Sequence, residues 1–291
     1  MRNERNWKKM LVAGVLTIST LLTGGLLGGC GGGQAGTADG LREKGELRVA
    51  MECAYAPYNW TQSTDSDGAV AIEGSSEFAN GYDVKIAKKI AAALNLKLRI
   101  VKSDWDSLIP AVQSGTVDCV IAGQSIKPER LQNVDFTKPY YYADIVTLTL
   151  KDSKFAKATS PADLAGAKAT SQQNTIWYDL CLPQIPQVQK LAGQNDVPAM
   201  LVALISGAAD VVVTDIPTAK AALRAYPQLT MLKFDQAKNY QVSESDVNIG
   251  ISVRKGNAVL KEKIDQILDG FSRDDMNKLM DEAITQQPLS K

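Results

Sequence analysis

The chain of 291 residues contains no histidine. This absence removes the side chain that most often acts as a general base near neutral pH and most often binds metals. The four cysteines do not have the spacing of a zinc site, and the sequence has neither a Gly-rich phosphate loop nor a Gly-x-Ser-x-Gly turn. The 32 basic and 32 acidic side chains balance, so no basic excess favours nucleic acid. We therefore expect no metal, no cofactor and no nucleic-acid partner.

The N-terminal residues have the pattern of a secretory signal. Four basic residues come before the apolar stretch Met10–Leu22, and Leu-Gly-Gly-Cys follows at 27–30. The apolar stretch is too short for a membrane span. Cys30 resembles the lipidated cysteine of a bacterial lipobox, the alternative being an ordinary signal peptide. We expect a signal peptide at 1–29, a Gly-rich flexible tether at 30–40 and a lipid anchor on Cys30.

An internal repeat is the most informative feature that is present. Residues 104–121 reappear 92 positions later as 196–213, with six of the eighteen aligned residues identical. Each copy has the pattern of a helix ended by Ser-Gly and followed by a short apolar strand. Two copies predict two similar lobes, in which the ends of the two strands, Gly123 and Asp215, face the same place. The alternative is chance similarity between two α/β units.

Hydrophobic periodicity predicts strands that alternate with helices. We expect strands at 46–52, 97–102, 145–150, 168–172, 230–233 and 249–254, and helices at 82–94, 161–164, 217–225, 259–269 and 273–282. A polar insertion occupies 61–78. This alternation is typical of α/β proteins with mostly parallel sheets.

The residues that follow the first repeat's strand favour an anion site. Pro128 stands near the first position of a predicted short helix, which places Arg130 in its first turn. The helix dipole opposes a cation there. Free backbone N–H groups and a guanidinium together could bind a carboxylate through two hydrogen bonds. The alternative is that Arg130 pairs with Glu129 at the surface.

Six runs of the sequence carry a resemblance to a known family: LRVAMECAYAPYNW (47–60), GYDVKIAKKIAAAL (81–94), DWDSLIPAVQSGTVDCVIAGQSIKPER (104–130), VDFTKPYYYAD (134–144), DLAGAKATSQQNT (163–175) and SGAADVVVTDIPTA (206–219). With these runs the chain resembles the polar-amino-acid family of bacterial extracellular solute-binding proteins, which serve ATP-driven importers. The resemblance implies a type II periplasmic-binding-protein-like fold: two α/β lobes, two hinge strands and a cleft between the lobes. Lobe 1 would comprise 41–143 plus 246–291, and lobe 2 would comprise 144–245.

The resemblance also implies a receptor for an α-amino acid. Arg130 would hold the α-carboxylate, helped by the Ser125 N–H. Thr175 would add a hydroxyl or an N–H to the same carboxylate, a helix N-cap being the alternative. Asp215 would pair with the α-ammonium, together with the Gly123 carbonyl and the Ser125 hydroxyl. The alternative for Asp215 is also a helix N-cap, and both roles can coexist.

The resemblance assigns the ligand's side chain to a second group of residues. Tyr55 and Trp105 would sandwich its aliphatic stem, a core role being the alternative for either. Glu52 would receive its far end and favour a cationic or amide-bearing group, and Gln172 would face the same pocket. Asn174 replaces a usual glycine, and asparagine tolerates unusual backbone angles.

The implied function is the substrate-binding component of an amino-acid ABC importer, lipid-anchored at the cell membrane and facing outside the cytoplasm. We expect a monomer whose partners are the amino acid, the permease subunits and, through Cys30, the membrane. The lobes would close about hinges near 143–145 and 242–247, and the ligand would stabilise the closed form. Basic amino acids lead over glutamine, with cystine and glutamate behind.

An enzyme is the competing class of function. The fold also resembles that of certain prephenate- and arogenate-type dehydratases and some lytic transglycosylases, which need an acid in the cleft. Glu52 is the candidate acid in this sequence. Because Arg130 and Asp215 complete an amino-acid clamp, we expect a binder and no enzyme activity. A sensory receptor is the third class.

Overall fold

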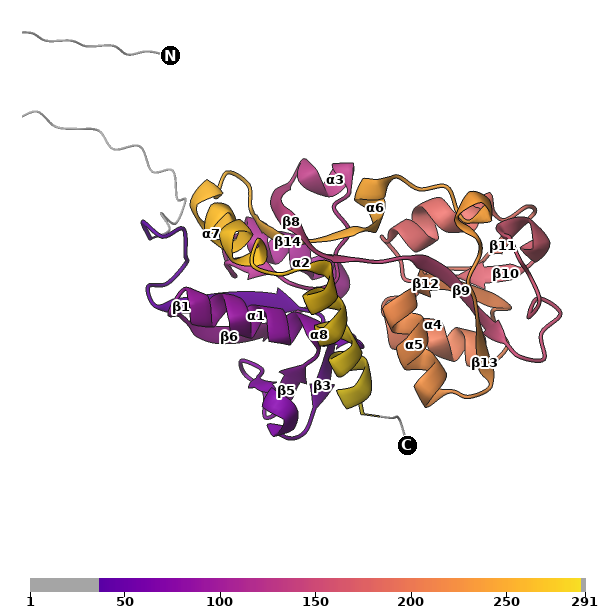
Figure 1. Ribbon diagram of the computed structural model, residues 1–291, viewed down its shortest axis with the longest axis horizontal. Coiled ribbons are helices and arrows are strands. Elements are labelled where there is room, and N and C mark those ends of the chain that lie inside the picture. The colour runs from indigo at the N-terminus through magenta and orange to yellow at the C-terminus, as the bar shows by residue number, and fades with distance from the viewer. Residues whose placement is uncertain (1–36, 289–291) are drawn as a thin grey trace, which may run out of the picture. The chain divides into compact units, whose positions relative to one another are not determined.

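The computed structural model describes residues 37–288 (Figure 1). The expected signal peptide, Cys30 and most of the expected tether lie outside the described residues. Within 37–288, no helix is both long and apolar enough to cross a membrane.

The first lobe is built on a five-stranded sheet in the order β6-β1-β7-β14-β8. β1 pairs in parallel with β6 and β7, whereas β14 is antiparallel to β7 and β8. The bounds are β1 Glu46–Met51, β6 Lys97–Lys102, β7 Cys119–Val120, β8 Val134–Tyr142 and β14 Asn248–Arg254. The predicted strand at 97–102 is confirmed, and β1 ends one residue earlier than predicted.

The second lobe is built on a sheet with the order β11-β10-β12-β9-β13. β10 pairs in parallel with β11 and β12, whereas β9 is antiparallel to β12 and β13. The bounds are β9 Ile145–Leu150, β10 Lys168–Thr170, β11 Gln189–Lys190, β12 Val211–Asp215 and β13 Leu229–Leu232. The predicted strand at 145–150 is confirmed.

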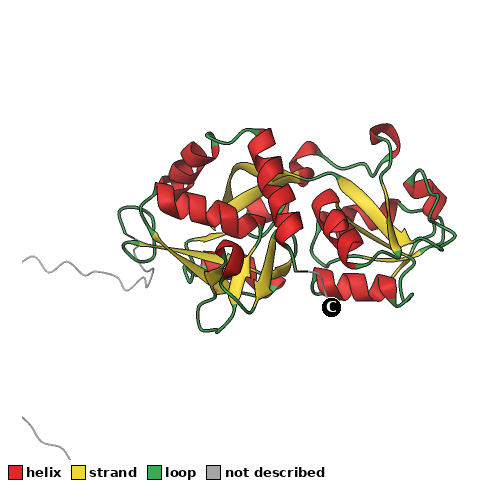
Figure 2. Cartoon of the chain, turned by 60° about the horizontal axis from the view of Figure 1, so that its bottom comes forward, coloured by secondary structure: helices red, strands yellow, loops and turns green. Residues whose placement is uncertain are grey.

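Helices pack on both sheets (Figures 1 and 2). α1, α2, α7 and α8 contact the first sheet, and α4 and α5 contact the second. The α-helices are α1 Tyr82–Ala93, α2 Leu108–Gln113, α3 Pro128–Leu131, α4 Val197–Ile205, α5 Ile216–Ala225, α6 Glu244–Val247, α7 Ala258–Leu268 and α8 Arg273–Gln286. Short 3-10 helices lie at Pro161–Leu164, where a helix was predicted, and at Trp105–Ser107 before α2, while a π turn spans Trp177–Cys181.

The two copies of the repeat occupy equivalent places. β7 and β12 are each the third strand of their sheet, with a parallel neighbour on one side and an antiparallel one on the other. Asp118 before β7 accepts the Arg48 N–H at 2.7 Å, and Asp210 before β12 accepts the Lys168 N–H at 2.9 Å. The shared contacts show that the repeat reflects a common framework rather than chance.

The strand register extends this equivalence to neighbouring strands. Val49 pairs with Cys119 in the first sheet, and Ala169 pairs with Val211 in the second. Because Cys119 and Val211 are equivalent in the repeat, each residue of β1 corresponds to the residue 120 positions later, which lies in β10 or directly beside it. The next residues along the chain continue this correspondence, so Glu52 corresponds to Gln172.

A small third sheet includes part of the polar insertion. Its order is β2-β3-β5-β4, with β2 Ala54–Tyr55, β3 Asn59–Gln62, β4 Val70–Ala71 and β5 Phe78–Asn80. Ile72, just beyond β4, bridges to Ile100 of β6, so the far end of the insertion lies along the edge of the first sheet. Its near end contacts the loop after β1, because the Thr61 hydroxyl donates to the Cys53 carbonyl at 2.8 Å.

The chain passes twice between the lobes. It leaves the first sheet at Tyr142 and enters the second at Ile145, and it returns through α6 into β14. The two crossings contact each other, since the Ala143 N–H donates to the Val247 carbonyl at 3.0 Å.

Candidate functional site

Glu52 and Gln172 meet between the lobes, where the strands β1 and β10 have just ended. The Gln172 Nε2 group donates to the two Glu52 carboxylate oxygens at 3.1 and 3.4 Å, and it also reaches the Asn195 carbonyl at 3.3 Å. Burial raises the pKa of Glu52 to about 8, although the amide of Gln172 lowers it. Within residues 37–288, the buried Oε1 atom of Gln172 has no hydrogen-bond donor. The pair therefore offers acceptors to a donor-rich group.

Asp215 ends β12 and is completely buried. Its Oδ1 atom accepts the Thr218 N–H at 2.8 Å, which caps α5, and its Oδ2 atom accepts the Tyr55 hydroxyl of the first lobe at 2.7 Å. Burial raises the pKa of this carboxyl above its ordinary value, and both hydrogen bonds oppose the rise. The expected helix N-cap is thus present, and one carboxylate oxygen faces the other lobe.

Tyr55 packs between Tyr58 and the expected site residue Gly123 in the first lobe. Its ring stacks on Tyr58 with 4.6 Å between the centroids. On another side the ring lies so close to Gly123 that a Cβ atom at that position would overlap it. Gly123 also has a positive φ of 63°, which suits glycine. Tyr55 therefore joins the strand end of the first repeat to Asp215 at the strand end of the second.

Arg130 lies at the edge of the same region, half-buried. Its guanidinium donates to the Ser125 carbonyl at 2.9 Å and to the Asn174 carbonyl of the second lobe at 3.0 Å, and it lies 5.3 Å from the centre of the Trp105 ring. Burial lowers its pKa to about 10, so it stays charged at neutral pH. Among residues 37–288, Arg130 forms no ion pair with Glu129, so the surface-pair alternative is wrong.

Two further expected residues make hydrogen bonds within the protein. The Thr175 hydroxyl donates to the Gln172 carbonyl at 2.7 Å and accepts the Tyr178 N–H at 3.3 Å, which is the N-cap alternative. The Ser125 carbonyl accepts from Arg130, and Ser125 also bridges to Ile249 of β14. Asn174 has a φ of 57°, as the tolerance of asparagine predicted.

Sequence reasoning missed several contacts between the lobes. The Asp106 carboxylate accepts from the side-chain amides of Gln173 at 2.8 Å and Asn174 at 2.7 Å. Lys127 pairs with Asp179 at 3.1 Å. Asp106 stands beside the predicted Trp105, but nothing in the sequence pairs it with residues almost seventy positions away.

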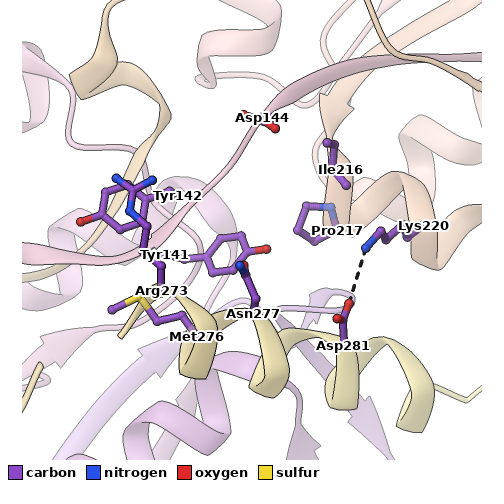
Figure 3. Close-up of a pocket in the computed structure, with 10 residues that line it drawn as sticks. All are labelled: Tyr141, Tyr142, Asp144, Ile216, Pro217, Lys220, Arg273, Met276, Asn277 and Asp281. Atoms are coloured by element: carbon purple, nitrogen blue, oxygen red, sulfur yellow. Dashed lines mark hydrogen bonds and ion pairs between the residues drawn. The ribbon is translucent and has the colours of Figure 1, made fainter. Parts of the chain in front are cut away.

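A cavity of about 390 Å³ lies next to this region, beside the first crossing between the lobes (Figure 3). Tyr141, Asp144, Ile216 and Pro217 line it together with α8 residues, among which Asp281 pairs with Lys220 at 3.5 Å. Tyr141 packs edge-on against Tyr58, and Ile216 directly follows Asp215. The cavity thus shares a wall with the expected site and includes none of its residues.

The family model for bacterial extracellular solute-binding proteins, family 3, matches residues 47–286. The chain belongs to this family. A probable histidine-binding protein of Campylobacter jejuni is 30% identical over 240 residues, which cover 82% of this chain and 80% of the relative. A putative ABC transporter arginine-binding protein 2 of Escherichia coli is 27% identical over 231 residues, which cover 78% of this chain and 86% of the relative.

Similar solved structures of amino-acid-binding proteins agree with the two-lobed architecture. An ancestral arginine-binding protein bound to arginine has a TM-score of 0.64 at 29% identity, covering 82% of this chain and 98% of that one. An ancestral arginine-binding protein bound to glutamine has a TM-score of 0.65 at the same identity and coverage. An ancestral amino acid-binding protein, a precursor of cyclohexadienyl dehydratase, has a TM-score of 0.67 at 27% identity, covering 82% of this chain and 95% of that one.

Proposed function

We propose that this family member binds a basic or amide-bearing L-amino acid between its lobes and delivers it to the permease of an ABC importer. The observation that carries the proposal is the arrangement of three ionisable side chains from two lobes. Arg130 and Glu52 come from the first lobe and Asp215 from the second, and each contacts a residue of the opposite lobe. A molecule with a carboxylate, an ammonium group and a further donor complements all three.

The α-carboxylate would lie against Arg130, and the α-ammonium against Asp215. A guanidinium presents parallel N–H groups that match a carboxylate, and a buried carboxylate is stabilised by a cation. Ser125 and Gly123 belong to the loop between Arg130 and the strand β7, so they are in position to contribute backbone groups. Thr175 shapes the facing loop, with its hydroxyl bound within that loop.

The far end of the ligand would reach Glu52 and Gln172. Glu52 supplies two carboxylate oxygens, and Gln172 supplies an oxygen that lacks a donor within the described residues. A guanidinium or an ammonium group would pair with the carboxylate and offset the cost of its burial, which a neutral amide does less well. The ligands named for the relatives agree with this choice, and we rank arginine first and glutamine second.

The proposed mechanism is closure of the two lobes over the ligand, followed by docking on the permease. We assign 41–143 plus 246–291 to lobe 1 and 144–245 to lobe 2, which the membership of β8, β9 and β14 in the two sheets supports. Because the ligand would contact both lobes, it would stabilise the closed arrangement by its differential affinity. The chain would act as a monomer.

We further propose that Cys30 carries the lipid anchor outside the cytoplasm, after removal of residues 1–29. The Leu-Gly-Gly-Cys run after the apolar stretch supports this. Mass spectrometry of membrane-extracted protein should show a mature N-terminus at a lipidated Cys30, and Cys30→Ala should release the protein. A different mature N-terminus, or a Cys30→Ala form that stays fully cell-bound, would contradict the anchor.

A dehydratase is the second candidate, because Glu52 is a buried acid with a pKa of about 8 and a similar solved structure is a dehydratase precursor. Such an enzyme would convert prephenate or arogenate with Glu52 as the general acid. The protein should leave prephenate unchanged, and phenylpyruvate formation that Glu52→Gln abolishes would favour the enzyme.

A thermal-shift panel of the twenty amino acids tests the proposed function most directly. Binding to the native state raises the melting temperature by mass action. L-arginine should give the largest shift, with smaller shifts for the other basic amino acids and glutamine, and none for aspartate. No shift with any amino acid would overturn the proposed function.

A further inference from the structure

Asp83 is a completely buried carboxylate to which neither the predicted site nor the proposed function gives a role. It is the second residue of α1, in the GYD run at 81–83. Burial raises its pKa to about 7, although the two hydrogen bonds that it accepts lower it. A buried carboxyl is costly unless its hydrogen bonds compensate, so its contacts indicate what it does.

Through Tyr140, which forms one arm of these contacts, Asp83 is linked to the loop after β7. The Tyr140 hydroxyl donates to Asp83 Oδ1 at 2.6 Å and accepts the Gly123 N–H at 2.9 Å. Tyr140 is completely buried and stacks on Tyr82, with 5.7 Å between the ring centroids, so its hydroxyl has a fixed position. Gly123 lies in the loop after β7, which continues through Ser125 to α3 with Arg130.

Through Asn59, which forms the other arm, Asp83 is linked to the loop after β1. The Asn59 Nδ2 group donates to Asp83 Oδ2 at 2.7 Å, and the Asn59 Oδ1 atom accepts the Cys53 N–H at 2.6 Å. Cys53 lies between Glu52 and Tyr55 and has a φ of 56°, which is unusual for a side chain with a Cβ atom. The N–H of Asp83 itself donates to the Tyr58 carbonyl at 2.8 Å, which holds the turn that carries Asn59.

We propose that Asp83 is a positioning residue for the binding site, which holds the two ligand-facing loops of the first lobe through Tyr140 and Asn59. The loops follow β1 and β7, which are neighbours in the sheet. Each loop has a left-handed residue at which a backbone N–H is bound by one arm. A carboxylate suits the centre of this network because it accepts on both oxygens, whereas both of its partners must donate. This proposal rests on the proposed function, since the loops matter as parts of the ligand site.

Two variants break the network in different places. Tyr140→Phe is nearly isosteric and removes the acceptor of the Gly123 N–H. Asp83→Asn keeps the size of the side chain but replaces one acceptor oxygen by an NH2 donor. This donor must then face the donor of either Tyr140 or Asn59. In both variants the affinity for L-arginine, measured by calorimetry on the full chain, should fall about tenfold or more, because loose supporting residues misplace the groups that touch a ligand.

Asp118→Asn is the matched control. Asp118 is also a buried carboxylate of the first lobe, and it accepts the backbone N–H groups of Arg42 and Arg48. It lies at the opposite end of β1 from Glu52, so its loss should lower stability and leave L-arginine affinity within about threefold. If Asp83→Asn and Tyr140→Phe bind within about threefold of the parent, or if the control weakens binding equally, the positioning role is wrong.

Amide hydrogen exchange followed by NMR tests the network without any ligand. Tyr140→Phe should speed exchange of the Gly123 N–H, and Asp83→Asn should speed exchange at Cys53 and Gly123, while Asp118→Asn should leave both slow. Unchanged exchange at both residues would overturn the proposal. If the parent protein binds no amino acid, the proposed function fails, and this exchange measurement alone decides whether Asp83 holds the loops.

Discussion

The two copies of the repeat differ most where their strands end. Before the strands they share a Ser-Gly helix end with nearly equal left-handed glycine angles, 74° at Gly115 and 75° at Gly207, and an aspartate bound to the neighbouring strand. After the strands, the first copy has Gly123, which leaves space for the Tyr55 ring, and the second has the buried carboxylate of Asp215. The register adds a second unequal pair, Glu52 and Gln172. The lobes therefore share the residues that build a sheet and differ in those that face the cleft.

The largest expected effect comes from removing the charges that follow the two strands. Arg130→Ala and Asp215→Asn should each weaken L-arginine binding by about 2–5 kcal/mol, because the opposite charge of the ligand would be buried without a partner. Asparagine at 215 can still accept the Thr218 N–H, so α5 keeps its cap. Calorimetric titration measures the loss. Exposed Glu129→Ala is the control, and if both variants bind within about threefold of the parent, the clamp is wrong.

The shared aspartates should affect stability and not binding. Asp118→Ala and Asp210→Ala should each lower the free energy of unfolding by about 1–3 kcal/mol, since a backbone N–H loses its acceptor. The larger loss should occur at Asp118, which is 4% exposed and accepts two N–H groups, whereas Asp210 is half-buried and accepts one. Denaturant titration measures both. A loss of L-arginine affinity in either variant would show that the aspartates that support the sheets also affect the ligand-binding site.

The unequal pair Glu52 and Gln172 should give a pH-dependent affinity. With a pKa of about 8, Glu52 carries a proton at pH 7, and a cationic ligand must displace it. Affinity for L-arginine should therefore rise up to about pH 8, by at most about tenfold per pH unit, and then level off. Calorimetry in buffers of different ionisation enthalpy should detect the released proton.

Glu52→Gln should remove this pH dependence of affinity, and it should weaken the binding of L-arginine more than the binding of L-glutamine. Equal losses for the two ligands would move specificity to Gln172 or to the insertion at 61–78.

The raised pKa of Glu52 also has a consequence for the stability of the ligand-free protein. Because the unfolded chain ionises Glu52 near pH 4.5 while the folded protein keeps the proton to about 8, ligand-free stability should decrease between these values and Glu52→Gln should reduce that decrease.

The smallest effect should distinguish the first residues of the two copies. Asp196 caps α4 by accepting the Ala199 N–H at 2.8 Å, whereas the Asp104 side chain makes no capping hydrogen bond. Asp196→Ala should cost about 0.5–2 kcal/mol of stability, and Asp104→Ala should cost less. Thermal denaturation of both variants measures the difference. Equal costs would contradict this distinction between the identical residues.

Much of the fold was predictable because local patterns determine it. The apolar alternation of β9 and the helical stripe of α1 gave nearly correct bounds, and the repeat gave the equivalence of the lobes. The small sheet was not predicted, since its strands are only two to four residues long and lie in or beside a polar insertion. β11 has two exposed residues, and its sequence carries no apolar signal.

The sequence did not predict the contacts between the candidate site residues. The sequence and the resemblance named Tyr55, Asp215, Glu52 and Gln172, but the two hydrogen bonds that join them span 160 and 120 positions. Such distances depend on how the lobes meet. Asp83 lies in the GYD run at 81–83, yet its proposed role depends on Asn59 and Tyr140, which approach it only in the folded protein.

The placement of the two shared aspartates, Asp118 and Asp210, has a consequence for the evolution of binding proteins. Asp118 and Asp210 anchor their sheets at one end, whereas the cleft residues lie at the opposite end. If the proposed ligand contacts are right, we expect exchanges at 52, 172 or 215 to change the molecule that is captured while the remote anchors continue to support folding. A lobe built in this way would need only a few exchanges at one end of its sheet to accept a new ligand.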